Sequence, residues 1–297
     1  MNNPLRLLGF CAILGLGLGL AFAAAGQDDD SDTAYKVQAK DEIRNVLKLA
    51  DPGKPGTLIV DNVFGAVDVQ GTERSDVEMV ARRTIRAKSA DRLGRAKAEV
   101  KLDMKAEGNS LDIYVDGPFR CQTQDCQGIR ERDLGYQVQY DFVLKVPRRI
   151  GLTVKTVNHG DITVRGVEGD FDVRNVNGKI LMESVAGSGR AHTVNGGVRV
   201  GFSRNPASAC SFRTVNGDVE TSFRDGLAAD FRLKTMHGEA YSDFASINLP
   251  AEPVTRETAG GRTIFKRGGA TGARVGKGGP EIRCETLNGD IIIKKND

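Results

Sequence analysis

Between Thr156 and Phe244, one short motif recurs: TVNHGDI at 156–162, NVNGKI at 175–180, TVNGGV at 193–198, TVNGDV at 214–219 and TMHGEA at 235–240. A further copy, TLNGDI, follows at 286–291 after an interruption. A motif that returns at a fixed period indicates a stack of equivalent structural units. This stretch therefore decides the fold that we expect for most of the chain.

The period of the repeat can be counted from its glycines. Gly160, Gly178 and Gly196 follow one another at intervals of 18 in the numbering, and Gly217 and Gly238 follow at intervals of 21. Further glycines at 169 and 187 divide the first two intervals into equal halves. The sequence thus predicts rungs of about 18–21 residues, each with two strands and two turns.

Apolar residues recur at fixed distances from each glycine, as Ile162, Val164 and Val167 do after Gly160. The alternation of the first two predicts a strand with one face inward, and the third re-enters the core after a bend. We therefore expect an all-β, single-domain β-solenoid or β-helix-like repeat, in which rungs stack about 4.8 Å apart. The alternative is an antiparallel meander or sandwich, in which Asn-Gly closes two-residue hairpins.

The Asn-Gly pairs are predicted to lie at the turns of stacked rungs. Glycine accepts a left-handed backbone there, while asparagine tolerates one and can hydrogen-bond to the asparagine of the next rung. We expect a structural turn ladder of Asn158, Gly160, Asn177, Gly178, Asn195, Gly196, Asn216, Gly217, Asn288 and Gly289. His237 occupies the Asn position of its copy and is interpreted as a turn residue.

Acidic residues follow the repeat glycine in several copies, at Asp161, Asp170, Asp218, Glu239 and Asp290. Calcium-binding repeats also carry Asp in their turns, but calcium needs six or more oxygens held closely. Lys179, Ser188 and Gly197 interrupt the row. We interpret these carboxylates as solvated turn residues, with Asp218 and Glu239 on adjacent rungs, and we predict no metal site and no cofactor.

The segment 1–55 is predicted to lie outside the β domain. Residues 1–25 carry one basic residue, an apolar run over 7–22 and small residues at 23–25, which predicts a signal peptide that is removed. A retained membrane anchor is the alternative, although the apolar run is short for spanning a bilayer. Residues 26–55 are predicted to form a flexible acidic and mixed tether, with a helical turn within Lys40–Ala50.

The predicted β domain covers residues 56–297. Its one short helix is expected at Ala90–Ala98, where Ser89 is available as the N-cap. The regular repeats occupy 156–244, a Gly-rich and basic insertion occupies about 250–280, and the last rung occupies 281–295. We interpret the insertion as a flexible loop, whose basic residues could contact anionic envelope polymers.

Four cysteines remain after the predicted leader, in a compartment that permits disulfides. Cys121 and Cys126 lie in one polar loop and are predicted to form a disulfide; a metal pair is the alternative, but no second Cys or His pair accompanies them. Cys210 and Cys284 are expected to point inward as buried thiols. At least one rung is expected to separate them, which would place them too far apart for a bridge.

These motifs resemble the bacterial DUF4097 family, whose members are exported β-strand-repeat proteins of unknown function that carry the label adhesin. The resemblance rests on the leader, the entry NVFGAVDV at 62–69, the Thr-Val-Asn-Gly-Asp turns and the last copy at 286–291. It covers about residues 57–295. It implies an envelope-associated β-solenoid and supplies no catalytic residues.

Composition narrows the function further. The chain has 42 Lys+Arg against 39 Asp+Glu, so its formal charge of +3 gives no global electrostatic reason to bind nucleic acid. Paired carboxylates in a cleft and nucleophile motifs are not evident. We expect a non-enzymatic adhesion or interaction scaffold, which is exported to the periplasm, the outer envelope or the medium.

The partner of such a scaffold would be an unknown envelope protein or polymer, and no stable transmembrane segment is expected after processing. Two alternatives remain open. One is an envelope sensor or regulatory accessory that binds an envelope component, and the other is a carbohydrate-active β-helix enzyme.

Overall fold

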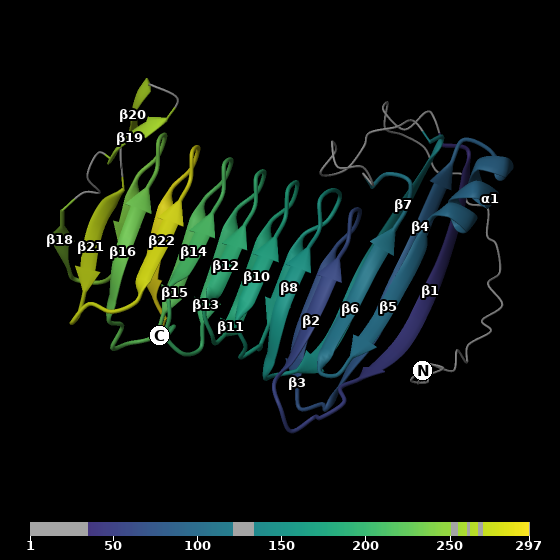
Figure 1. Ribbon diagram of the computed structural model, residues 1–297, viewed down its shortest axis with the longest axis horizontal. Coiled ribbons are helices and arrows are strands. Elements are labelled where there is room, and N and C mark those ends of the chain that lie inside the picture. The colour runs from purple at the N-terminus through teal and green to yellow at the C-terminus, as the bar shows by residue number, and fades with distance from the viewer. Residues whose placement is uncertain (1–34, 121–133, 251–254, 260–261, 267–269, 297) are drawn as a thin grey trace, which may run out of the picture.

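The computed structural model describes residues 35–120, 134–250, 255–259, 262–266 and 270–296. These residues are mostly β, in two large mixed sheets with one short helix (Figure 1). The first sheet has ten strands, in the order β1 (Val37–Lys48), β4 (Asp76–Ala87), β7 (Tyr136–Pro147), β3 (Val67–Thr72), β9 (Ile162–Arg165), β11 (Ile180–Val185), β13 (Val198–Phe202), β15 (Val219–Phe223), β23 (Ile291–Lys295) and β17 (Ala240–Ser242).

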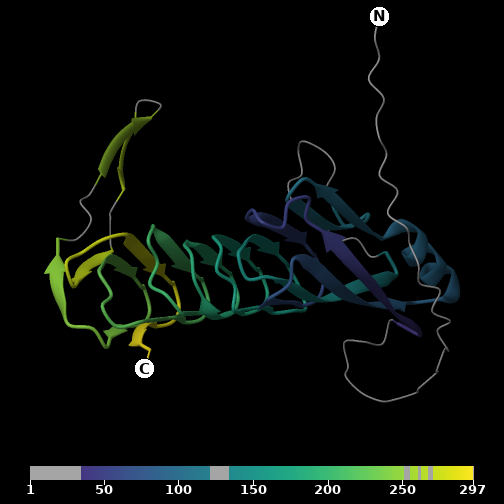
Figure 2. The same cartoon turned by 90° about the horizontal axis from the view of Figure 1, so that it is seen from below.

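The second sheet has eleven strands, in the order β18 (Ser246–Leu249), β21 (Thr271–Val275), β16 (Ala229–Lys234), β22 (Glu281–Glu285), β14 (Cys210–Arg213), β12 (Gly189–His192), β10 (Phe171–Arg174), β8 (Ile150–Lys155), β2 (Gly56–Asp61), β6 (Ser110–Asp116) and β5 (Lys101–Glu107). The remaining two strands, β19 (Thr255–Ala259) and β20 (Arg262–Lys266), pair with each other. Figure 2 shows the two large sheets as facing layers along the length of the molecule.

Between β8 and β16 the chain alternates between the two sheets, and neighbouring strands within each sheet run parallel. Ile162 pairs with Ile180 and Ile180 with Val198, an offset of 18 in the numbering, whereas Val198 pairs with Val219, an offset of 21. The Asn-Gly pairs of this region therefore connect the two sheets and do not close hairpins. We call one strand of each sheet, together with the motif turn that joins them, a rung.

The core lies between the two sheets and is filled by the inward residues of each strand. Val164, Val200, Phe212 and Phe231 are fully buried, and each lies at an alternate position of its strand. Phe202 and Phe223 stack with their ring centroids 5.1 Å apart. The alternation in the sequence thus places apolar side chains in the core and leaves the other positions of each strand outside.

The order of the rungs differs from their order in the chain. The last rung, β22–β23, lies between β14–β15 and β16–β17, so Val219 and Ala240 both pair with Ile291. The expected adjacency of Asp218 and Glu239 is therefore wrong. Asn288 carries hydrogen bonds on both of its sides, to Asn216 and to His237, which suits an internal rung.

The predicted tether contains an ordered strand. Val37–Lys48 forms β1, which pairs antiparallel with β4 along its whole length. Leu47 is buried, and the guanidinium of Arg83 makes an ion pair with Asp41 at 2.5 Å. The expected helical turn in Lys40–Ala50 is wrong, because apolar residues there are too sparse to reveal the alternation on which the strand depends.

The prediction of the helix is confirmed, whereas the prediction of a flexible loop for the insertion is not. The helix expected at Ala90–Ala98 is confirmed as α1 (Ala90–Glu99), and the Ser89 hydroxyl accepts a hydrogen bond from the Arg92 amide at 3.3 Å, as an N-cap does. The insertion, expected to be a flexible loop, contributes β21 to the second sheet, where β21 pairs antiparallel with β16 and with β18. The predicted leader and the Cys121–Cys126 disulfide lie outside the described residues.

Candidate functional site

The predicted turn asparagines lie in one continuous row. The amide of Asn177 donates to Asn158 at 2.6 Å, and Asn195, Asn216 and Asn288 each donate to the preceding asparagine at 2.7 Å. His237 ends the row, with its Nδ1 3.1 Å from Asn288 Oδ1. Each amide is held by its neighbours, so this row stabilises the stacked turns.

The glycines of these turns are required mainly by close approach of neighbouring rungs. A Cβ on Gly178 would lie 2.2 Å from the carbonyl oxygen of Gly160, and a Cβ on Gly289 would lie 2.1 Å from that of Gly217. Gly196, Gly217 and Gly289 also have φ between 139° and 150°. Close packing of backbones therefore explains glycine here more generally than the left-handed conformation that the sequence predicts.

Two further turn positions have roles that sequence reasoning missed. The threonine of the motif donates its hydroxyl to the glycine carbonyl of the adjacent rung at 2.7–2.9 Å in five copies: Thr156, Thr193, Thr214, Thr235 and Thr286. Turn carboxylates accept a backbone N–H from the adjacent rung: Asp161 from Lys179, Asp170 from Ser188, Asp218 from Asp290, and Asp290 from Glu239. The recurrence of Thr and Asp at fixed positions was the available signal. The motif is thus a set of stacking contacts.

The outer positions of the second sheet carry a different pattern, which we call the arginine face. It comprises the outward residues of β8, β10, β12, β14, β22 and β16. Seven are basic (Lys155, Arg174, Arg190, Arg213, Arg232, Lys234, Arg283) and four are acidic (Asp172, Asp230, Glu281, Glu285), a net charge of 7 − 4 = +3. Parallel register places these residues in rows along the molecule.

The corresponding face of the first sheet is balanced. We call the outward positions of β3, β9, β11, β13, β15 and β23 the opposite face. Three are basic (Arg165, Arg199, Lys294) and three are acidic (Asp68, Glu183, Glu220), and these residues pair with one another. The charge excess is therefore a property of one face.

Carboxylates on the arginine face are shared between guanidinium groups. Asp172 accepts two hydrogen bonds from Arg174, each 2.8 Å long, and another from Arg190 at 2.9 Å. Burial raises the pKa of Asp172, but hydrogen bonds and charges from these arginines outweigh burial and hold the pKa below its ordinary value. Similarly, Glu285 pairs with Arg213 at 2.5 Å and with Arg283 at 3.3 Å. These shared carboxylates hold the arginines in place.

His192 lies in the same row, between Arg174 and Arg213 on the adjacent strands. Its Nε2 is 3.0 Å from the Ser211 hydroxyl. Burial and the charge of Arg213 lower the pKa of its imidazole. His192 is therefore a neutral group within the row at neutral pH.

We expect the free energy of unfolding to fall as the pH drops from about 7.5 to about 5, partly because of His192. The unfolded chain takes up a proton near pH 6.5, whereas folded His192 does so only at lower pH. Below the ordinary pKa the unfolded state therefore binds more protons and is favoured. Urea unfolding at both pH values should show a smaller drop for His192→Gln than for the wild type. Identical drops would contradict this role.

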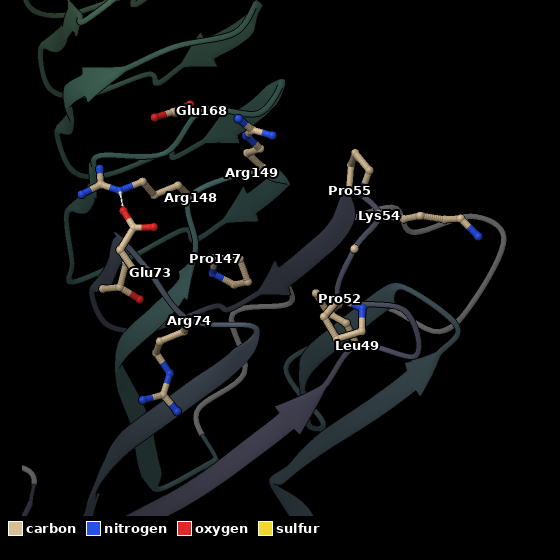
Figure 3. A pocket seen from close by; sticks show the side chains of 12 residues that line it. Leu49, Pro52, Lys54, Pro55, Glu73, Arg74, Pro147, Arg148, Arg149 and Glu168 are labelled. Atoms are coloured by element: carbon tan, nitrogen blue, oxygen red, sulfur yellow. Dashed lines mark hydrogen bonds and ion pairs between the residues drawn. The ribbon is translucent and has the colours of Figure 1, made fainter.

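A cavity of about 510 Å³ lies at the turns remote from the asparagine row (Figure 3). It opens between the loop of Pro52 and Lys54 and the segment Arg148–Arg149. Its cations are largely neutralised within the protein, since Arg148 pairs with Glu73 at 2.5 Å and Arg74 pairs with Asp76 and Glu78. The cavity therefore offers less uncompensated charge than the arginine face.

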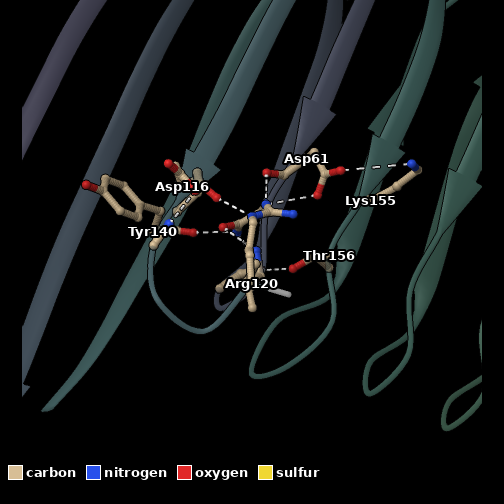
Figure 4. Close-up of polar contacts among 11 residues, drawn as sticks. Asp61, Asp116, Arg120, Tyr140, Lys155 and Thr156 are labelled. Atoms are coloured by element: carbon tan, nitrogen blue, oxygen red, sulfur yellow. Dashed lines mark hydrogen bonds and ion pairs between the residues drawn. The ribbon is translucent and has the colours of Figure 1, made fainter. Parts of the chain in front are cut away.

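A second polar cluster surrounds Arg120, next to the predicted disulfide loop (Figure 4). The guanidinium donates to the Val115 carbonyl at 2.6 Å and to the Asp61 carboxylate at 3.0 Å. It also lies 4.1 Å from the centroid of the Tyr114 ring. These contacts tie the chain before the predicted loop to β2 and β6, which is a structural role.

The cysteines that the structure describes are buried free thiols, as expected, although the expected separation is wrong. Cys210 and Cys284 lie on the adjacent strands β14 and β22, where Cys210 pairs with Ile282. An offset of two residues across one strand spacing puts their Cα atoms about 8 Å apart, beyond the reach of a disulfide. Burial raises the pKa of both thiols.

Within the described residues, no group of three or more His, Cys, Asp or Glu side chains is arranged to hold a metal ion. The same part of the chain contains no helix long and apolar enough to cross a membrane. Neither observation assigns a chemistry to the protein.

No protein-family model and no curated protein matches the sequence. Among solved structures, a "putative cell adhesion protein" from Clostridium sporogenes is 9% identical, with a TM-score of 0.41 over 87% of this chain and 100% of that chain. A "putative adhesin" from Bacteroides fragilis is 12% identical, with a TM-score of 0.37 over 87% and 98%. A "putative lipid binding protein" from Parabacteroides distasonis is 13% identical, with a TM-score of 0.25 over 86% and 97%. Similarity this low gives no ground for transferring a function.

Proposed function

We propose that this chain is an exported, non-enzymatic interaction scaffold of the bacterial cell envelope, built as a β-solenoid of 18–21-residue rungs like that expected of the DUF4097 family. The arginine face carries this proposal. It is an extended surface of regular spacing, on which the outward residues of six strands have a charge excess of +3 while those of the opposite face are balanced. Such asymmetry serves recognition and is not needed to stack the rungs.

The hydrogen bonds that the turn carboxylates accept support a non-enzymatic role. Glycosidases need two carboxyl groups on either side of the substrate bond, with one pKa raised. Here Asp161, Asp170, Asp218 and Asp290 each accept a backbone N–H from the adjacent rung. These four groups are engaged in stacking, which leaves the strand faces as the surfaces for a partner.

Cosedimentation of the full chain with cell envelopes tests the proposal. We expect the chain to pellet with envelope fractions from a bacterium, with or without an outer membrane, through its arginine face. A face variant, Arg190→Gln/Arg213→Gln/Lys234→Gln, should pellet several-fold less. The matched control neutralises three cations of the opposite face, Arg165→Gln/Arg199→Gln/Lys294→Gln, and should pellet like the wild type.

Two results would overturn the proposal. One is that the wild-type chain stays in the supernatant with every envelope fraction. The other is that both variants pellet as well as the wild type. Exposed ion pairs contribute about 0–1 kcal/mol each, so both variants are expected to remain folded, which thermal melting followed by circular dichroism checks.

A further inference from the structure

The register of the strands places four of the seven cations of the arginine face in one row and the other three, Arg190, Arg232 and Arg283, in the row beside it. Lys155, Arg174, His192 and Arg213 occupy one row across β8, β10, β12 and β14, and the row continues through Glu285 to Lys234. Adjacent strands are about 4.8 Å apart, so six strands extend about 24 Å. The row is thus long enough to contact several units of a linear polymer at once.

These cations retain hydrogen-bonding capacity. An arginine has five N–H donors. The Arg190 side chain, 56% exposed, makes one ion pair, to Asp172, and the Arg213 side chain, 50% exposed, makes one to Glu285. Lys234 is exposed and makes no ion pair with any described residue. Most donors of these three side chains therefore face solvent, while the carboxylates beside the two arginines hold the guanidinium planes in position.

The geometry points to a linear acidic polysaccharide as the ligand of the arginine face, lying across its strands with its carboxylates on the exposed cations Arg190, Arg213 and Lys234. This inference rests on the proposed function, because it names the ligand class of the same surface. Carboxylate fits the guanidinium fork in a two-bond geometry. The face already shows this geometry internally, where Arg174 makes two 2.8 Å bonds to Asp172.

The composition of the face disfavours single-stranded nucleic acid. Surfaces that bind single strands combine positive charge with aromatic side chains on which bases stack. The outward positions of the six strands, as the structure describes them, hold no Phe, Tyr or Trp. Hydroxyl and charged groups at these positions suit a sugar polymer better.

Calorimetric titration of the full chain with polygalacturonate, a linear polyuronate, tests this inference. We expect binding at about 50 mM salt that weakens steeply by about 200 mM. Binding releases counterions from the polymer, and added salt opposes this release. The face variant Arg190→Gln/Arg213→Gln/Lys234→Gln should bind about tenfold more weakly, from three contacts of about 0.5 kcal/mol each. Its salt dependence should also be shallower.

The controls separate the sources of anionic charge. The opposite-face variant, Arg165→Gln/Arg199→Gln/Lys294→Gln, changes net charge equally and should bind within about twofold of the wild type. Linear polyphosphate and single-stranded DNA should bind more weakly than the polyuronate, and neutral dextran should not bind. Tighter binding of either competitor would overturn the assignment, as would equal weakening by both variants.

The salt dependence of the wild-type chain needs no variant, so a folding defect cannot mask a negative result. Failure of this inference is also distinguishable from failure of the proposed function. If envelope fractions still bind through the arginine face while the polyuronate does not, only the ligand class is wrong. If neither binds, the proposed function fails as well.

Discussion

Deletion of residues 280–297, which removes the last rung, is expected to unfold the C-terminal end of the molecule. The deleted strands β22 and β23 lie between two other rungs, so their loss separates β14 from β16 and β15 from β17. Ile282, Ile291 and Ile293 belong to this rung and are buried. Burial of three such side chains contributes about 5–9 kcal/mol as an upper estimate, which is comparable to the whole stability of a typical domain.

Limited proteolysis and thermal melting measure this effect. In the truncated chain, segment 229–249 should become protease-sensitive, and a second transition should appear below the main one. As a control, a short Gly-Ser linker in place of residues 255–266 removes β19 and β20, which pair only with each other among the described strands. This deletion should leave the main transition unchanged.

A truncated chain that stays as stable as the wild type would also have a definite structural meaning. If the truncated chain melts and resists protease like the wild type, then β16–β17 can stack directly on β14–β15. That is the order which the regular interval between Gly217 and Gly238 predicts from the sequence. The experiment therefore decides whether the inserted rung is essential to the end of the molecule.

The sequence predicted what depends on local spacing. The offsets of 18 and 21 between paired strands, the row of turn asparagines and the helix with its Ser89 cap all follow from patterns that are local in the chain. It could not predict which copies are neighbours, because each copy carries groups that can stack on any other. Only the course of the chain through β18 and β21 brings the copy at Asn288 between two earlier ones.

The arginine face could not be predicted from the sequence for the same reason. The intervals that separate Arg174, Arg190, Arg213 and Arg283 along the chain are all different, so these residues follow no single period. They become neighbours once alternate strands are assigned to one sheet and the last rung is inserted. Net charge gave no sign of the asymmetry, because a formal charge of +3 does not say where on the molecule the basic residues lie.

The turn carboxylates show a second limit on what the sequence can predict. Asp218 and Asp290 were interpreted as solvated, since an acidic residue beside glycine is common in exposed turns. In the structure Asp218 accepts the backbone N–H of Asp290 at 2.9 Å. Spacing could indicate that Asp recurs at this position, but the N–H that it accepts belongs to another rung, whose identity depends on the stacking order.

Gly289→Ala is expected to lower the free energy of unfolding by about 4 kcal/mol, which combines a steric and a conformational cost. The new Cβ would lie 2.1 Å from the carbonyl oxygen of Gly217, and this oxygen also accepts the Thr286 hydroxyl at 2.8 Å. Backbone held on both sides cannot move away as a flexible side chain would. In addition, φ at Gly289 is 150°, a value that residues with a Cβ rarely adopt.

Two other glycines separate these costs. Gly226 has φ of 74° but nothing within 4 Å of its Cβ position, so Gly226→Ala incurs only the conformational cost, about 1 kcal/mol. Gly94 lies in α1 with open space around it, so Gly94→Ala should stabilise the chain by about 0.5–1 kcal/mol. Thermal melting should place Gly94→Ala above the wild type, Gly226→Ala slightly below it and Gly289→Ala about 10 °C below it. A Gly289→Ala variant that melts with Gly226→Ala would mean that the rungs can separate enough to admit a methyl group, and close backbone stacking would no longer explain why this turn carries glycine.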